Sequence, residues 1–180
     1  MDIHAQSGFV AIRRLQPADV PKLFAAVRES IVELCQWMPW CHPDYSLKDS
    51  GDFISQSASA WETGEQYDFA IIDMRDATLL GGVGLNQINR LHNFANLGYW
   101  VRSTRTRQGI APAATLMVAQ FGLRELGLSR LEIVAAVGNH FSQRVAEKAG
   151  ATREGILRNG LRQHEKQHDA VMYSLIPEDL

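Results

Sequence analysis

Leu97-Gly98-Tyr99-Trp100-Val101-Arg102 begins the stretch that decides the fold, and this stretch continues to residue 150. The six residues predict a strand, and a short loop that ends at Gly109 follows it. A helix, a second strand and a helix capped by Asn139 are expected next. A strand followed by a loop and a helix favours anion binding, because the first turn of a helix carries unpaired N–H groups and a partial positive charge.

The loop itself is rich in positive charge. Arg102, Arg105 and Arg107 fall within six residues, and Gly109 lets the backbone approach a ligand without a Cβ atom in the way. We therefore expect this stretch to hold an anionic cofactor, and we expect the rest of the chain to present a substrate to it.

The composition is that of an ordinary globular protein. The chain has 180 residues, of which 46% are hydrophobic and 21% charged, and this predicts one domain with a sizeable core. The formal net charge is −2, so we expect no direct binding to nucleic acid or to an anionic membrane. No apolar run approaches the ~18 residues of a membrane-spanning helix, and the N-terminus lacks a signal-peptide pattern.

The two cysteines do not suggest a metal site. Cys35 and Cys41 lack metal-ligand spacing, so free thiols and a cytoplasmic location are the expectation. The sequence leaves the oligomeric state open, and a homodimer is compatible with it.

Outside the central stretch, apolar periodicity predicts the remaining elements. Pro17 begins a helix that should end by Pro39, and a second helix is expected from Ser46 to about Thr63. The other expected strands span residues 9–15, 66–73, 79–89, 152–162 and 169–176. With about seven strands and four helices, the fold class is α/β: a mixed, mostly antiparallel sheet with helices on both faces.

Two motif-like stretches have ordinary explanations. Gly81-Gly82-Val83-Gly84 is not followed by a helical pattern, so it predicts a strand that passes close to a neighbour or carries a bulge. His164-Glu165-Lys166-Gln167-His168 fits the zinc-protease pattern H-E-x-x-H, but that chemistry needs both histidines on one helix. Here the segment lies between two strand patterns, so we interpret it as a polar hairpin end and expect no metal.

An aromatic loop follows the first helix. Trp37-Met38-Pro39-Trp40-Cys41-His42-Pro43 is restricted by its prolines and must cover something with its aromatic surface. It is either a hydrophobic plug on the first helix or one wall of a substrate pocket, to which Trp37 and Trp40 would contribute. Adjacent residues such as Cys41 and His42 rarely face each other as nucleophile and base, so that alternative is disfavoured.

Several motifs, in this order and spacing, resemble those of the GNAT superfamily of N-acetyltransferases, and nearest its RimJ/RimL branch, which acetylates N-terminal amines of ribosomal proteins. The resemblance covers essentially the whole chain. It rests on the aromatic loop and on Gly98-Tyr99-Trp100-Val101, Arg107-Gln108-Gly109-Ile110-Ala111, Asn139-His140-Phe141-Ser142, Glu147-Lys148-Ala149-Gly150 and Glu154-Gly155-Ile156-Leu157-Arg158.

The resemblance implies acetyl-CoA as co-substrate and assigns residues to it. The family's pyrophosphate loop fits at Gly109 and Ala111, although its first position, normally Arg or Gln, is Thr106 here. A backbone N–H near Trp100 or Val101 would face the thioester oxygen, and Ser142 would lie near the sulfur. The implied cofactor-binding residues are Trp100, Val101, Arg105, Arg107, Gln108, Gly109, Ile110, Ala111, Asn139 and Ser142.

Ser142 is the implied catalytic residue, because it could give a hydrogen bond or proton to the leaving thiolate. Its structural alternative is a first-turn residue beside the Asn139 cap. The general base is missing: the position that carries a glutamate in the ribosomal-protein enzymes is Leu161 here, and another common position is Asn96.

The expected function is acetyl transfer to an amine, most readily a protein or peptide N-terminus such as that of a ribosomal protein. An α-amine has a pKa of ~7.7–8.0 against ~10.4 for lysine, so it suits a site without an evident base. A small-molecule amine, such as an antibiotic, polyamine or aminoacyl conjugate, is the alternative acceptor. A non-catalytic acyl-CoA-binding module and a zinc hydrolase are the other functions considered.

Overall fold

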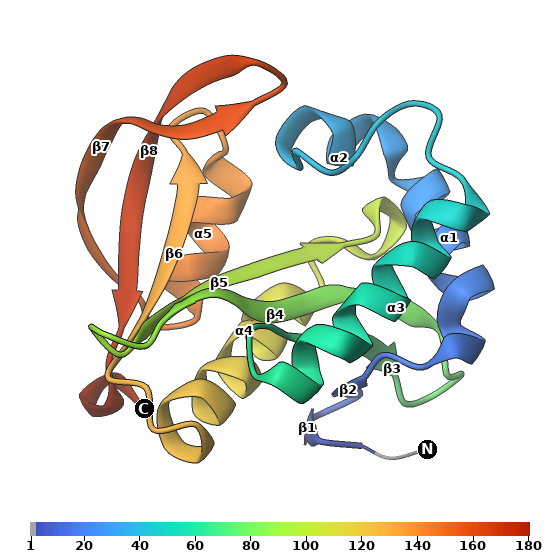
Figure 1. The fold of residues 1–180 in the computed structure, drawn as a ribbon, viewed down its shortest axis with the longest axis horizontal. Helices are drawn as coiled ribbons and strands as arrows, with labels where there is room; N and C mark the ends of the chain where they lie inside the picture. The colour runs from blue at the N-terminus through green and yellow to red at the C-terminus, as the bar shows by residue number, and fades with distance from the viewer. Residues whose placement is uncertain (1–2) are drawn as a thin grey trace.

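The computed structural model describes residues 3–180, which form one eight-stranded sheet with helices on both faces (Figure 1). The strand order is β1-β2-β3-β4-β5-β6-β8-β7. All neighbours are antiparallel except β5 and β6, which run parallel. The strands are β1 Ala5–Ser7, β2 Val10–Arg14, β3 Tyr67–Asp73, β4 Leu79–Asn89, β5 Phe94–Val101, β6 Arg130–Ala136, β7 Thr152–Gln163 and β8 Lys166–Leu175. The predicted α/β class and mixed sheet are confirmed.

Five α-helices cover the sheet: α1 Val20–Glu29, α2 Ile31–Trp37, α3 Leu47–Thr63, α4 Ile110–Gln120 and α5 His140–Lys148. Alternating residues of β3 show the two faces. Phe69 and Ile71 pack into the core shared with α4, whereas Ala70 and Ile72 pack under α1 and α3. Figure 1 shows α3 crossing in front of β4, with α4 behind the sheet.

Three predictions about the elements differ from the structure. The helix expected from Pro17 to Pro39 is two helices, because the chain bends at Ser30 (φ −108°, ψ 15°). The sheet has an eighth strand, β1, and β8 begins at Lys166 rather than at residue 169. A hairpin between β7 and β8 explains the earlier start, because only His164 and Glu165 form its turn.

The glycines of β4 lie where the sheet is crowded, as predicted. A Cβ atom on Gly81 would stand 2.1 Å from the Trp100 carbonyl oxygen, and one on Gly84 would stand 2.6 Å from the Tyr67 carbonyl oxygen. The register of β3 against β4 also shifts between Ile71 and Ile72. Both alternatives proposed for this strand, close approach and a bulge, are therefore present.

No helix within residues 3–180 combines the length and the apolar character that crossing a membrane would require.

Candidate active site

The two parallel strands at the centre of the sheet diverge and open a cleft. β5 and β6 pair only at their starts, from Phe94 to Asn96 on β5, and among residues 3–180 the rest of β5 has no strand partner on that side. Figure 1 shows β6 turning away from β5 toward α5. A cavity of about 1060 Å³ lies along the divergence, lined by β4, β5, β6, the aromatic loop and the end of β7.

Backbone donors of β5 face this opening. The Arg102 N–H donates to the Leu80 carbonyl oxygen of the β4 side (2.8 Å), and the direction of N–H groups alternates along a strand. The N–H groups of Trp100 and Gly98 therefore point toward β4, and those of Val101 and Tyr99 point into the cleft. Of the two alternative positions expected for a donor to the thioester, the Val101 N–H has the right direction and the Trp100 N–H does not; the Tyr99 N–H points the same way as that of Val101.

The loop before α4 has the features of an anion site. Gly109 is the N-cap of α4 with φ +76°, and a Cβ atom there would have open space around it. Within residues 3–180, the N–H groups of Gln108, Gly109, Ile110 and Ala111 have no protein acceptor. Unpaired donors at a helix start with open space before them fit the pyrophosphate of acetyl-CoA.

The arginines of this loop are mostly engaged elsewhere. Arg102 donates to Glu29 and to the Leu79 carbonyl oxygen. Arg105 pairs with the carboxylate of Asp73 (3.4 Å) and lies 3.8 Å from that of Asp76. Arg107 is exposed, and its guanidinium lies 5.9 Å from the ring centre of Phe141 on α5. Arg107 is therefore the arginine with freedom to contact a ligand.

Ser142 stands at the opposite wall of the cleft. The Asn139 side chain accepts from the Ser142 N–H (3.1 Å), which makes Asn139 the N-cap of α5, as predicted. The Tyr99 hydroxyl donates to the Ser142 carbonyl oxygen (2.8 Å) and lies 3.1 Å from Ser142 Oγ. Burial raises the pKa of Tyr99 to about 12, so the phenol keeps its proton at neutral pH. Sequence reasoning missed this role of Tyr99, although Gly98-Tyr99-Trp100 was one of the quoted motifs.

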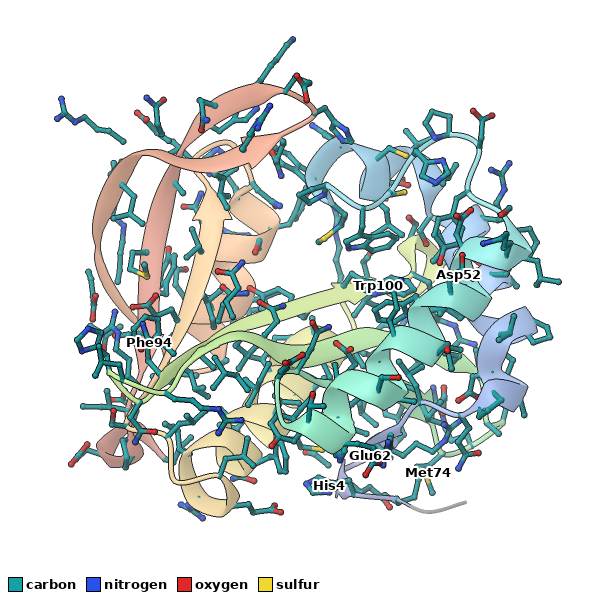
Figure 2. All side chains as sticks on the ribbon, in the orientation of Figure 1. His4, Asp52, Glu62, Met74, Phe94 and Trp100 are labelled. Carbon is teal, nitrogen blue, oxygen red and sulfur yellow. The ribbon has the colours of Figure 1, made fainter. Side chains whose placement is uncertain are left out.

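The aromatic loop forms a wall of the cleft. Trp37, Met38 and Trp40 all line it, and the Trp40 ring lies 6.1 Å from that of Trp100. Figure 2 shows Trp100 near the end of β5. The tip of the β7–β8 hairpin reaches this wall: Gln163 Nε2 donates to the Trp37 carbonyl oxygen, and His164 Nε2 lies 2.6 Å from the Cys35 carbonyl oxygen. The loop is therefore placed as a pocket wall and also packs against α1 and α2.

The two positions expected to carry a base both line the cleft. Leu161 has no titratable group, and the Asn96 amide donates to Asn86 Oδ1 (2.9 Å). Asp68 of β3 also lines the cleft, and nothing in the sequence pattern had marked it. Its surroundings are described below.

The geometry does not support the two disfavoured alternatives, the H-E-x-x-H zinc motif and Cys41 with His42 as nucleophile and base. His164 and Glu165 form a hairpin turn with φ of +43° and +70°, so H-E-x-x-H does not lie on a helix. His42 Nε2 lies 3.8 Å from the Asp49 carboxylate, and Cys41 Sγ lies 3.1 Å from Cys35 Sγ. Burial raises the pKa of Cys41 to about 12, with Cys35 adding to the shift, which disfavours a reactive thiolate.

Comparison with known proteins agrees with this geometry. The family described as "Acetyltransferase (GNAT) domain" matches residues 10–152. The chain is 30% identical over 177 residues to the Bacillus subtilis protein named "Putative ribosomal N-acetyltransferase YdaF", covering 94% of this chain and 92% of that protein. It is 24% identical to the ribosomal-protein-serine acetyltransferase of Escherichia coli, with 87% of each chain covered.

A solved structure shows the same fold. The structure of RimL, a ribosomal L7/L12 alpha-N-protein acetyltransferase in complex with coenzyme A, superposes with a TM-score of 0.90 at 22% identity, covering 99% of this chain and 100% of that one. The resemblance seen in the sequence motifs is thereby confirmed. The protein belongs to the GNAT family of acetyl-CoA-dependent N-acetyltransferases.

Proposed function

We propose that the acceptor is the N-terminal α-amine of a protein or peptide, and that a ribosomal protein is the first candidate. The observation that carries this proposal is the pair Leu161 and Asn96, which place an apolar group and an amide at the two cleft positions where a carboxylate was expected. An acceptor with a pKa of ~7.7–8.0 is on the order of 10% neutral at pH 7, whereas lysine is almost wholly charged. The names of the Bacillus and Escherichia relatives point to the same substrate class.

The residues of the cleft have distinct roles in this proposal. Acetyl-CoA supplies an activated acetyl group, and its pyrophosphate fits the free N–H groups at the start of α4. The N–H groups of Tyr99 and Val101 donate to the developing oxyanion, an effect worth up to ~3–4 kcal/mol for a well-placed donor. Ser142 donates a hydrogen bond to the departing sulfur, with Tyr99 holding its position. Trp37 and Trp40 shape the entrance for the acceptor.

A small-molecule amine remains the rival acceptor, and one observation favours it. Asp49, Asp52 and Asp68 all line the cleft, and an acidic lining suits a polyamine or an aminoglycoside. One of these carboxylates already pairs with a protein cation, Asp52 with Lys48, and Asp49 lies 3.8 Å from His42 Nε2. That pairing reduces the negative field available to a polycation.

The test is a panel of acceptors assayed for release of coenzyme A. It contains peptides with free N-termini, the same peptides with blocked N-termini and one internal lysine, polyamines and aminoglycosides. We expect the free N-termini to give the highest kcat/KM. Faster turnover on the lysine peptides or polyamines would refute the proposed acceptor.

A further inference from the structure

We propose that Asp68 accepts the proton of the attacking amine, directly or through one water molecule. This inference rests on the acetyl transfer described above. Asp68 takes the proton that an already neutral amine loses during attack, a role that Leu161 and Asn96 cannot fill, but a carboxylate is too weak a base to deprotonate a lysine of pKa ~10.4 beforehand. It is carried by the position of the Asp68 side chain over Gly84 of β4, which pairs with Gly98 of β5.

The sheet register brings Asp68 toward the reacting end of the cleft. Asp68 of β3 pairs with Gly84 of β4, and Gly84 pairs with Gly98 of β5, so the three lie side by side on one face. A Cβ atom on Gly84 would stand 2.8 Å from Asp68 Oδ1. The carboxylate therefore extends over β4, in space that any other residue at position 84 would occupy.

From that position the carboxylate is within reach of an acceptor at β5. Adjacent strands lie about 4.8 Å apart, so Oδ1 is about one strand spacing from Gly98. Gly98 has no side chain to block the path, and its nearest neighbours on that face are Asn86 Nδ2 and Asn96 Nδ2, at 3.9 and 4.0 Å from an added Cβ. Tyr99 follows Gly98, and its N–H points into the cleft. An amine beside Gly98 is therefore close to the expected position of the thioester. A base acts at hydrogen-bond distance or through one water.

The Asp68 carboxylate is held by hydrogen bonds from the side chains of Gln66 and Ser57. Gln66 Nε2 donates to Oδ2 (2.7 Å). Within residues 3–180 the Asp68 carboxylate has no ion-pair partner, whereas Asp49 and Asp52 contact His42 and Lys48. Burial raises the pKa of Asp68, against the opposing hydrogen bonds from Gln66 and Ser57, and a higher pKa makes the carboxylate a better proton acceptor.

The proton transfer balances with the acetyl transfer. The amine nitrogen forms a bond to the thioester carbonyl carbon, and the C–S bond breaks. The proton lost by nitrogen goes to Asp68 Oδ1, and the thiolate is stabilised by Ser142 until it takes a proton from solvent. Asp68 then returns its proton to solvent, so no further reagent is needed.

The experiment compares Asp68→Asn with Asp68→Glu, using whichever acceptor of the panel reacts fastest. We expect Asp68→Asn to lower kcat by about 100-fold or more, the usual range for a general base, with unchanged affinity for acetyl-CoA by calorimetry. Asp68→Glu keeps a carboxylate and should retain far more activity than the amide. A purely structural carboxylate would show the opposite order, because asparagine keeps the size and the hydrogen bonds of aspartate.

The pH profile distinguishes the roles further. The wild-type kcat should rise with pH as Asp68 loses its proton. Asp68→Glu should shift the midpoint of that rise, and Asp68→Asn should abolish it. Other titratable groups also line the cavity, and neither variant changes their effect on the pH profile. They are His42, Tyr45, Asp49, Asp52, Tyr99 and Arg162. Asp44→Asn is the matched control, since Asp44 is exposed, lies outside the cavity lining and undergoes the same charge change.

Two outcomes separate this proposal from the proposed acceptor. Undiminished kcat in folded Asp68→Asn, or equal pH profiles in wild type and Asp68→Glu, would overturn the role of Asp68. A polyamine or aminoglycoside as the fastest acceptor would overturn the N-terminal acceptor instead, and the Asp68 comparison would then be made on that amine.

Discussion

Tyr99 and Ser142 join β5 to α5 at the point where the sheet opens. The phenol is buried and donates to the Ser142 carbonyl oxygen, so it fixes the first turn of α5 relative to β5. The Asn139 cap fixes the same turn from the other side. These two contacts hold the backbone of Ser142, and its hydroxyl lies 3.1 Å from that of Tyr99, so the serine is pre-organised. Pre-organised donors lose little free energy when charge develops on a substrate.

Replacing Ser142 by alanine tests that role. We expect kcat to fall about 10-fold to 100-fold while the KM for acetyl-CoA changes little, because a group acting on the leaving thiolate works in the transition state. Steady-state kinetics with a peptide acceptor measure both constants. Tyr99→Phe should show a smaller loss of the same kind, since it frees Ser142 without removing it. An unchanged kcat in Ser142→Ala would make Ser142 a helix-terminus residue only.

Gly109 offers a second residue-scale prediction. Gly109→Glu would put a negative charge beside the free N–H groups of α4, so calorimetry should detect no binding of acetyl-CoA. Gly127→Glu is the matched control. Gly127 also has a positive φ (+68°) and open space around an added Cβ, but lies in the turn before β6. Both variants incur the same backbone strain, so equal affinities for acetyl-CoA would refute a pyrophosphate site at Gly109.

The elements themselves could be predicted where local rules decide them. The Asn139 cap, the Gly109 start of α4 and the crowded glycines of β4 follow from residue type and spacing, and the structure has them. The break at Ser30 could not be predicted, because it depends on a distant contact: Ser30 Oγ accepts from the Ser103 N–H (2.9 Å). The position of Asp68 in the cleft could not be predicted either. It depends on the pairing of distant strands, whose register aligns Asp68 with Gly84 and Gly98.

The strands β6, β8 and β7 are held by one ionic cluster, and it predicts a response to acid. Arg130 of β6 donates to Glu154 of β7 (2.6 and 2.7 Å), and Ser174 of β8 donates to the same carboxylate (2.6 Å). These bonds lower the pKa of Glu154 to about 2, with Arg130 as the largest cause. A carboxyl whose pKa is lowered by folding stabilises the protein fully above its unfolded pKa of about 4.5. That stabilisation is lost as the pH falls toward 2.

Glu154→Gln is the variant that measures this contribution. The side chain is 39% exposed, so solvent screens the pair and we expect a loss of about 1 kcal/mol or less at pH 7. Urea unfolding at pH 7 and pH 3 should show that the difference from wild type shrinks in acid. Glu165→Gln is the control, because its partner Arg162 lies with it at an exposed hairpin end. A difference that is as large at pH 3 as at pH 7 would contradict the assignment.

At the scale of the whole molecule, the protein has two parts that meet around the cleft. One part holds β1–β5 with α1–α4, and the other holds β6–β8 with α5. They are joined at the base by the short pairing of β5 with β6 and by contacts between α4 and α5. At the open end the hairpin tip reaches α2, as Figure 1 shows at the top of the view. The cleft is therefore bounded at its open end by two hydrogen bonds between distant segments, on the side where we propose that the acceptor binds.

This closure leads to a prediction about acceptor binding. Gln163 is 6% exposed, and its amide is the donor to the Trp37 carbonyl oxygen. Gln163→Ala would leave that oxygen without its donor and loosen the contact between the hairpin and the aromatic wall. A lost buried hydrogen bond costs about 1 kcal/mol, so we expect the acceptor KM to rise about fivefold. The affinity for acetyl-CoA should stay unchanged, because its expected contacts lie on β5, α4 and α5. Gln167→Ala, at an exposed position of the neighbouring strand, is the control. An equal rise in the acceptor KM of both variants, or a matching loss of acetyl-CoA affinity in Gln163→Ala, would show that the hairpin tip does not close the acceptor side.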